Sequence, residues 1–136
     1  MNFRHTRFLM LVAVIGLTLL PFRANSAELS KDSLETVLKN VTDEQAMLVD
    51  VREKKEWDAG HVEGAIFLPL SALKKGVDAE TLANVLPADK VLYIHCVVGK
   101  RAVTAGNVLE EFDYSVRPIK PGYKELIEAG FKKADD

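Results

Sequence analysis

Cysteine is almost absent from this chain, because Cys96 is the only one in 136 residues. A single cysteine excludes an intramolecular disulfide, and together with three scattered histidines it gives no metal-ligand spacing. A sulfur atom bound to Cys96 would have to leave to an external acceptor, since the chain has no second thiol to resolve it. The sequence therefore predicts a fold held by its core, with no metal and no other cofactor.

An excess of positive charge is also lacking. The 18 basic and 20 acidic residues give a net charge of −2, and without the first 26 residues, which hold three arginines and no acid, it is −5. This balance argues against a general nucleic-acid binder. The length and a hydrophobic content of 48% suit one small globular domain.

Long apolar runs are missing except at the N-terminus, over residues 8–20. Two arginines precede this run and small residues follow it, which is the order of a secretory signal peptide, and 13 residues are few for a membrane span. We expect residues 1–26 to be a signal peptide, cleaved after Ser26 or after Ala27. The remaining domain, residues 27–136, is then expected in the periplasm with no stable membrane span. An uncleaved N-terminal anchor is the alternative.

Strand-like and helix-like segments alternate along the rest of the chain. This alternation predicts an α/β domain with a mainly parallel central sheet flanked by helices on both faces. The expected strands are Met47–Val51, Ala65–Leu68, Val91–Ile94 and Ser115–Ile119. Two helices are expected after the caps Ser30 and Asp78. The helix after Asp78 is expected to have an apolar face of Leu82, Val85 and Leu86. The helix after Cys96 is expected to have one of Ala105, Val108, Leu109 and Phe112, and the helix near the C-terminus one of Tyr123, Leu126 and Ile127.

The cysteine ends an apolar strand and opens a loop before a helix that begins near Arg101 or Ala102. The unpaired N–H groups and positive dipole end of a helix stabilise anions, including a thiolate. Lys100 and Arg101 are unfavourable there unless an anion binds over the loop, and the Arg101 guanidinium can also hold loop carbonyls. A buried, inert cysteine beside ordinary surface charges is the alternative.

Three stretches of sequence together resemble the rhodanese (sulfurtransferase) family. They are LVDVRE at 48–53, EWDAGHVEGAI at 56–66 and CVVGKR at 96–101. The likeness continues to Pro121-Gly122, where the family usually has two glycines, and to Leu126, where many members have tryptophan. It implies a rhodanese-like fold.

The resemblance also implies roles for individual residues. Cys96 becomes the nucleophile, and the substrate is expected to bind to the loop residues Val97, Val98, Gly99, Lys100 and Arg101. Asp50 and Arg52 share one strand face, so we expect them to pair with each other or to brace the loop, in a supporting role. Three aromatic residues are expected to be structural: His61 in a turn bonded to the backbone, Trp57 in the core, and His95 packed or hydrogen-bonded on the face opposite Cys96.

The implied activity is that of a thiosulfate sulfurtransferase. A Cys96 thiolate would take sulfane sulfur from thiosulfate or a persulfide donor and pass it to cyanide or a small thiol. Small-molecule donors and acceptors are the expected partners, and the protein is expected to be a monomer. Members that use thiosulfate generally have polar residues where Val97 and Val98 stand, which leaves the donor open.

Two other functions remain as alternatives. A non-catalytic rhodanese-like binding module usually lacks the cysteine that this chain retains. A cysteine-loop phosphatase or arsenate reductase has five residues between cysteine and arginine, whereas this loop has four.

Overall fold

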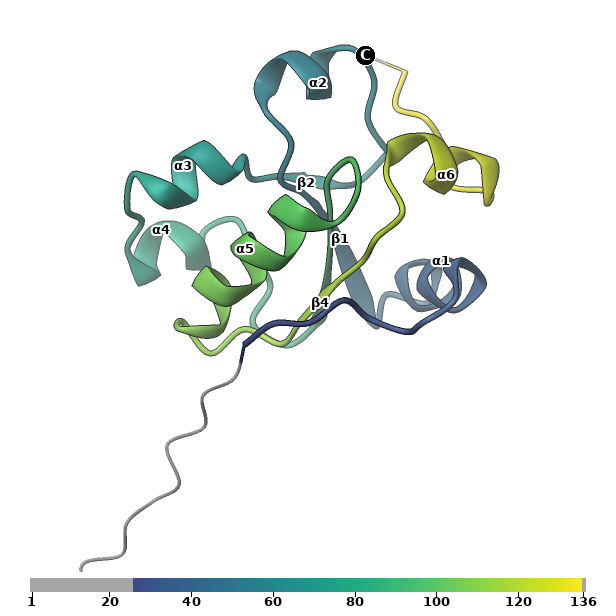
Figure 1. Cartoon of the computed structure of the whole chain (residues 1–136). Helices are drawn as coiled ribbons and strands as arrows, with labels where there is room; N and C mark the ends of the chain where they lie inside the picture. Colours follow the sequence, from purple (N-terminus) through teal and green to yellow (C-terminus); the bar gives the residue numbers. More distant parts are fainter. Residues whose placement is uncertain (1–25, 136) are drawn as a thin grey trace, which may run out of the picture.

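A computed structural model describes residues 26–135 as a parallel sheet with helices on both faces (Figure 1). The sheet order is β2-β1-β3-β4 and all neighbouring strands are parallel. The strands are β1 (Ala46–Asp50), β2 (Ile66–Phe67), β3 (Val91–His95) and β4 (Val116–Pro118). The helices are α1 (Leu34–Thr42), α2 (Lys54–Asp58), α3 (Leu70–Lys74), α4 (Ala79–Ala83), α5 (Lys100–Glu110) and α6 (Tyr123–Glu128). The predicted α/β class and parallel sheet are confirmed.

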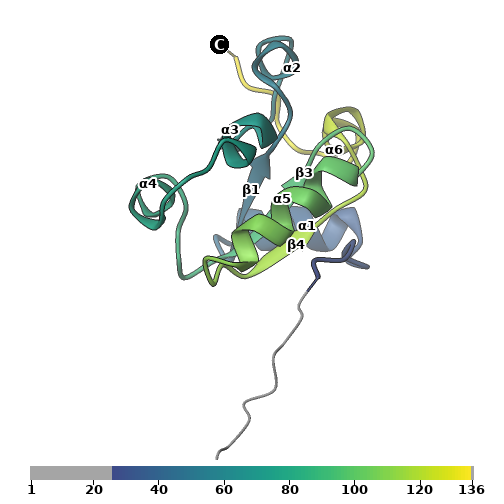
Figure 2. The same cartoon turned by 60° about the vertical axis from the view of Figure 1, so that its left-hand side comes forward.

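Two apolar clusters fill the two sides of the sheet, beneath the helices that Figure 2 shows on either side. The helices α3, α4 and α5 cover one side, while α1 and α6 cover the other. Successive side chains of β3 point alternately into the two clusters: Leu92 and Ile94 face α5, and Tyr93 faces α1. Helix α2 lies beyond one end of the sheet, away from both layers (Figures 1 and 2).

The first helix begins later than the sequence predicts. Its cap is Ser33, whose Oγ accepts the N–H of Thr36 at 3.2 Å, and not Ser30. The backbone N–H of Ser30 instead donates to the carbonyl of Pro118 at 2.7 Å. This bond holds residue 30 against the end of β4, and the Oγ of Ser30 accepts the N–H of Asp32 at 3.1 Å in a local turn.

Helix α4 is capped by Asp78 as expected, through the N–H of Thr81 at 2.7 Å. It ends at Ala83, so Val85 lies beyond it and is 48% exposed, whereas the sequence predicted an inward side chain. Helices α2 and α3 were not expected. Each has five residues, which is too short for an apolar pattern with a period of 3.6 to show.

The segment expected as a signal peptide lies almost wholly outside the described residues. Ser26 is exposed and Ala27 is buried, with its N–H donating to Asn107 Oδ1 at 2.6 Å. Within residues 26–135 no helix is long and apolar enough to cross a membrane.

Strands β1 and β3 place the candidate site. They are neighbours in a register that pairs Asp50 with His95, the last residue of each strand. Cys96 follows β3 directly, and Arg52 follows β1 after Val51. The carboxyl ends of parallel strands are where open α/β sheets hold their ligands, so these residues lie where a site is expected.

Candidate active site

The cysteine lies at the bottom of its loop, with the residue only 1% exposed. Its Sγ accepts the backbone N–H of Gly99 at 3.2 Å. Gly99 has φ 93° and precedes α5, which begins at Lys100. The first N–H groups of this helix have no intrahelical acceptor, and the dipole of the helix is positive at this end. The sulfur atom therefore lies where a negative charge is stabilised.

Two glycines let neighbouring chain segments approach the loop closely. A Cβ on Gly99 would lie 2.9 Å from Leu29 Cδ2, besides requiring a left-handed backbone that other residues rarely adopt. A Cβ on Gly122 would lie 2.6 Å from the carbonyl oxygen of Val97. Gly122 is the glycine retained after Pro121, so the turn before α6 packs directly on the backbone of the cysteine loop.

Asp50 and Arg52 form a bidentate ion pair below the loop. Arg52 Nη2 lies 2.7 Å from Asp50 Oδ2, and Nε lies 3.0 Å from both carboxylate oxygens. The pair is buried, with Asp50 0% and Arg52 6% exposed. Arg52 also donates to the carbonyl of Gly60 at 2.8 Å, and its guanidinium lies 5.1 Å from the ring centre of Tyr123. These contacts join β1 to the turn after α2 and to α6.

His95 lies on the side of β3 opposite Cys96, as the alternation of strand residues predicts. Its Nδ1 is 3.3 Å from the carbonyl of Cys96, so this nitrogen carries the proton and donates it. Its Nε2 faces Asp50 Oδ2 at 3.4 Å without a hydrogen bond. Complete burial lowers the pKa of His95, which keeps the ring neutral near pH 7. His95 thus packs below the site and holds the backbone of the nucleophile.

Arg101 is held by Glu56 from α2, which the sequence analysis did not foresee. The guanidinium makes two hydrogen bonds to the carboxylate, of 2.7 and 2.8 Å, in place of the expected bonds to loop carbonyls. Glu56 also accepts the N–H of Glu53 at 2.9 Å, which caps α2. The hydrogen bonds from Arg101 lower the pKa of Glu56 to about 2. Glu56 in turn raises the pKa of Arg101, with smaller contributions from Cys96.

The remaining loop side chains point outward. Val97 and Val98 are 50% and 65% exposed, and Lys100 is exposed as well. Within residues 26–135, no carboxylate pairs with Lys100. The two adjacent cations therefore differ, because Arg101 is neutralised by Glu56 whereas Lys100 keeps its charge free for an anion.

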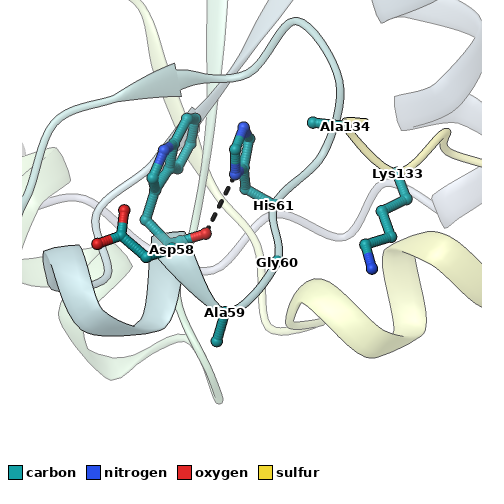
Figure 3. Close-up of a pocket in the computed structure, with 7 residues that line it drawn as sticks. Asp58, Ala59, Gly60, His61, Lys133 and Ala134 are labelled. Carbon is teal, nitrogen blue, oxygen red and sulfur yellow. Dashed lines mark hydrogen bonds between the residues drawn. The ribbon is translucent and has the colours of Figure 1, made fainter. Parts of the chain in front are cut away.

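Trp57 and His61 lie together at the end of α2, beside a pocket of about 300 Å³ (Figure 3). The His61 ring stacks on Trp57 with 3.6 Å between ring centres, and His61 Nδ1 lies 3.1 Å from the carbonyl of Trp57. His61 is thus a turn residue bonded to the backbone, as expected. Trp57 is half-buried and outside both apolar clusters, which corrects the expected core position.

The structure brings Cys96, Asp50, Arg52 and the loop residues to one edge of the sheet and adds three residues that the sequence analysis gave no role. Glu56 stood inside the quoted motif, three residues after Glu53, which is the spacing of a capping box. Gly122 stood in the turn that resembles the family's glycine pair. No local signal showed its contact with Val97 or the contact of Leu29 with Gly99, because each joins distant segments. Residues 26–135 contain no cluster of His, Cys, Asp or Glu that could hold a metal ion.

Comparison with known sequences gives a match to the rhodanese-like domain over residues 33–129. The uncharacterized protein YqhL of Bacillus subtilis is 32% identical over 108 residues, which cover 73% of this chain and 74% of YqhL. The putative sulfur carrier protein YrkF of the same organism is 29% identical over 104 residues. That match covers 76% of this chain but only 48% of YrkF, so the chain spans about half of that relative.

Solved structures agree with these matches. The human single-domain sulfurtransferase TSTD1 is 25% identical with a TM-score of 0.59, covering 71% of this chain and 94% of TSTD1. A rhodanese-related protein from Thermoplasma volcanium, 22% identical, shares the fold with a TM-score of 0.61 over 76% of this chain and 95% of its own. Both the sequence motifs and the fold agree with one assignment: this chain belongs to the rhodanese-like domain family.

Proposed function

We propose that this chain is a sulfurtransferase that carries sulfane sulfur on Cys96. The observation that carries the proposal is the position of the Cys96 sulfur, 3.2 Å from the Gly99 N–H at the start of α5. A thiolate is stabilised there, and so is the charged outer sulfur of a persulfide. The names of the relatives, a sulfur carrier and a sulfurtransferase, agree with this chemistry.

The reaction proceeds by two displacements. The Cys96 thiolate attacks the outer sulfur of thiosulfate, the S–S bond of the donor breaks, and sulfite leaves with the electron pair. The enzyme then carries a Cys96 persulfide. Cyanide or a thiolate attacks its outer sulfur and restores the Cys96 thiolate, so no oxidant or reductant is consumed. The backbone N–H groups of residues 97–101 stabilise the outer sulfur between the two steps.

Mass spectrometry after incubation with thiosulfate tests this function. Wild-type protein is expected to gain one sulfur atom and to lose it on addition of cyanide. Cys96→Ser is nearly isosteric but a far weaker nucleophile, so it should stay folded, gain no sulfur and show no turnover. Sulfur transfer by the serine variant at a rate comparable to wild type would contradict the assignment.

The same experiment separates the alternative functions. Wild-type protein that gains no sulfur from thiosulfate or from a persulfide donor would support a binding module. Hydrolysis of an aryl phosphate that depends on Cys96 would support the phosphatase class. The length of the loop disfavours the second outcome, because four residues separate Cys96 from Arg101 where such an enzyme has five.

We also propose that the chain is exported and cleaved after Ser26. Ala27 is 5% exposed and its nitrogen donates to Asn107 Oδ1, so cleavage one residue later would remove both the contact and the burial. The new amino group can still donate to Asn107. N-terminal sequencing of the protein from a periplasmic fraction is expected to begin at Ala27. Intact Met1 in the membrane fraction would support an uncleaved anchor instead.

A further inference from the structure

Exposed apolar side chains gather around the cysteine loop. Within the described residues, four large apolar side chains are exposed, and three of them lie here: Leu29 at 41%, Val97 at 50% and Val98 at 65%. The fourth, Val85, lies apart on the segment after α4. Exposed apolar groups that cluster beside a reactive group mark a contact with a ligand or partner more often than single ones do.

Two grooves pass over this cluster and meet at Val98. The larger, of about 430 Å³, is lined by Leu29, Val98 and Val103 and also by Lys100. The smaller, of about 250 Å³, is lined by Val97, Val98 and Pro121 and also by Lys120. The larger groove has the volume of an ordinary small-molecule site, roughly 300 to 1,000 Å³.

Each groove combines apolar walls with one cation. In the smaller groove Glu125 adds a carboxylate, which accepts the N–H of Gly122 at 3.1 Å. An inorganic dianion such as thiosulfate gains from the lysines but nothing from the valines, because burying apolar surface stabilises only an apolar partner. An anion that carries an apolar group matches both features.

We propose that the preferred donor of this site is an organic sulfane anion with an apolar substituent, and that Val97 and Val98 select it. Such compounds are organic thiosulfonates and organic persulfides, which share an anionic outer sulfur and a carbon-bound inner sulfur. The proposal rests on the sulfurtransferase function and specifies its donor. The apolar substituent lies along the grooves while the outer sulfur reaches Cys96.

The transfer from a thiosulfonate balances without a further reagent. The Cys96 thiolate forms a bond to the outer sulfur, the S–S bond of the donor breaks, and the sulfinate leaves with the electron pair. From an organic persulfide the leaving group is the corresponding thiolate. In both cases Cys96 becomes a persulfide.

A donor series tests the proposal with wild-type protein. Methanethiosulfonate and butanethiosulfonate release sulfinates of similar reactivity and differ by three methylenes. Full burial of one methylene corresponds to about a fourfold effect, and partial burial in open grooves gives about tenfold for three, in favour of the butane compound. Comparing a butyl persulfide with a methyl persulfide shows whether organic persulfides, the other type of donor, give the same preference for the longer chain.

Variants identify the side chains responsible. Val98 lines both grooves, so Val98→Ser is expected to lower the butane-to-methane ratio of kcat/KM to about two. Val97→Arg adds a cation in place of an apolar wall and should raise thiosulfate turnover relative to butanethiosulfonate. Val85→Ser is the matched control, since Val85 is as exposed as Val97, and it should keep the wild-type ratio.

The outcomes separate this proposal from the function on which it rests. If no donor places sulfur on Cys96, the sulfurtransferase function is wrong and the donor preference fails with it. If thiosulfate loads Cys96 but chain length has no effect on kcat/KM, the function holds and the preference is refuted. A chain-length effect that survives in Val98→Ser would equally refute the role of the grooves.

Discussion

Two arginine–carboxylate pairs lie beside the cysteine loop, and they differ in burial and in what they connect. Asp50 ends β1 and Arg52 lies two residues after it, with side chains 0% and 7% exposed respectively. Arg101 and Glu56 lie 45 residues apart, with side chains 30% and 33% exposed. The first pair joins elements of the scaffold, whereas the second removes one of two cations from the surface around the nucleophile. The two pairs have similar geometry, but the Arg52–Asp50 pair stabilises the fold whereas the Arg101–Glu56 pair sets the charge around the nucleophile.

Breaking the buried pair is expected to have the largest effect on stability. Asp50→Asn keeps the shape of the side chain but leaves the Arg52 guanidinium buried without a counter-charge. We expect the free energy of unfolding to fall by about 3–5 kcal/mol, measured by denaturant titration. Glu63→Gln, at an exposed carboxylate, serves as the control and should change it by less than about 0.5 kcal/mol. A loss in Asp50→Asn no larger than in Glu56→Gln would contradict the contrast between the pairs.

The two neighbouring cations of the loop differ in the same way, because Lys100 is free and Arg101 is paired. Lys100→Ala removes a charge-assisted contact to the donor worth roughly 1.5–3 kcal/mol, or about ten- to a hundredfold in kcat/KM for thiosulfate. Stability should stay the same or rise by a few tenths of a kcal/mol, since the lysine opposes the helix dipole. Lys74→Ala controls for the loss of one positive charge at a distant, exposed site. Full activity together with a lower melting temperature in Lys100→Ala would make Lys100 structural.

His95 connects the buried pair to the loop and makes stability depend on pH. Burial lowers its pKa in the folded protein, whereas the unfolded chain takes up a proton as pH falls below about 6.5. The unfolded state then binds more protons, so stability is lost on acidification, with a slope approaching about 1.4 kcal/mol per pH unit. Denaturant titrations between pH 7 and 5 measure this slope. We expect this slope to vanish in His95→Asn.

The buried pair was predictable from the sequence, and the exposed pair was not. Residues two apart on a strand share a face, so Asp50 and Arg52 were expected to meet. No local pattern relates Glu56 to Arg101, because their contact depends on how α2 sits above the start of α5. Family resemblance pointed to the cysteine loop and the parallel sheet but not to this contact.

Two errors in the secondary structure concern the boundaries of helices. Ser30 has the residue type of a helix cap, but it lies against Pro118 of a distant strand and the helix starts after Ser33. Val85 has the spacing of an inward residue, but α4 ends two residues before it. Local propensity was correct about the kind of element in both places but not about where the helix began or ended.

Breaking the exposed pair should affect stability far less than breaking the buried pair, and it should strengthen donor binding, whereas Lys100→Ala weakens it. Glu56→Gln is expected to cost about 1 kcal/mol or less, because the two side chains remain partly solvated. The pKa of Glu56 is about 2 in the folded protein, below its ordinary value of 4.5. The ionised Glu56 carboxylate therefore contributes fully to the stability of the fold above pH 4.5, and this contribution is lost as pH falls toward 2. The difference in stability between wild type and Glu56→Gln should shrink over that range.

The same substitution releases the charge of Arg101 beside the nucleophile. Adding one free cation about 4 Å from a bound anion in a watery site is worth about 1 kcal/mol, so the KM for thiosulfate should fall about fivefold. Steady-state kinetics at constant ionic strength measure this change, and Glu63→Gln, which alters the net charge equally, should leave KM unaffected. A rise in KM for Glu56→Gln would show that Glu56 supports binding by orienting Arg101, and the two pairs would then both be scaffold.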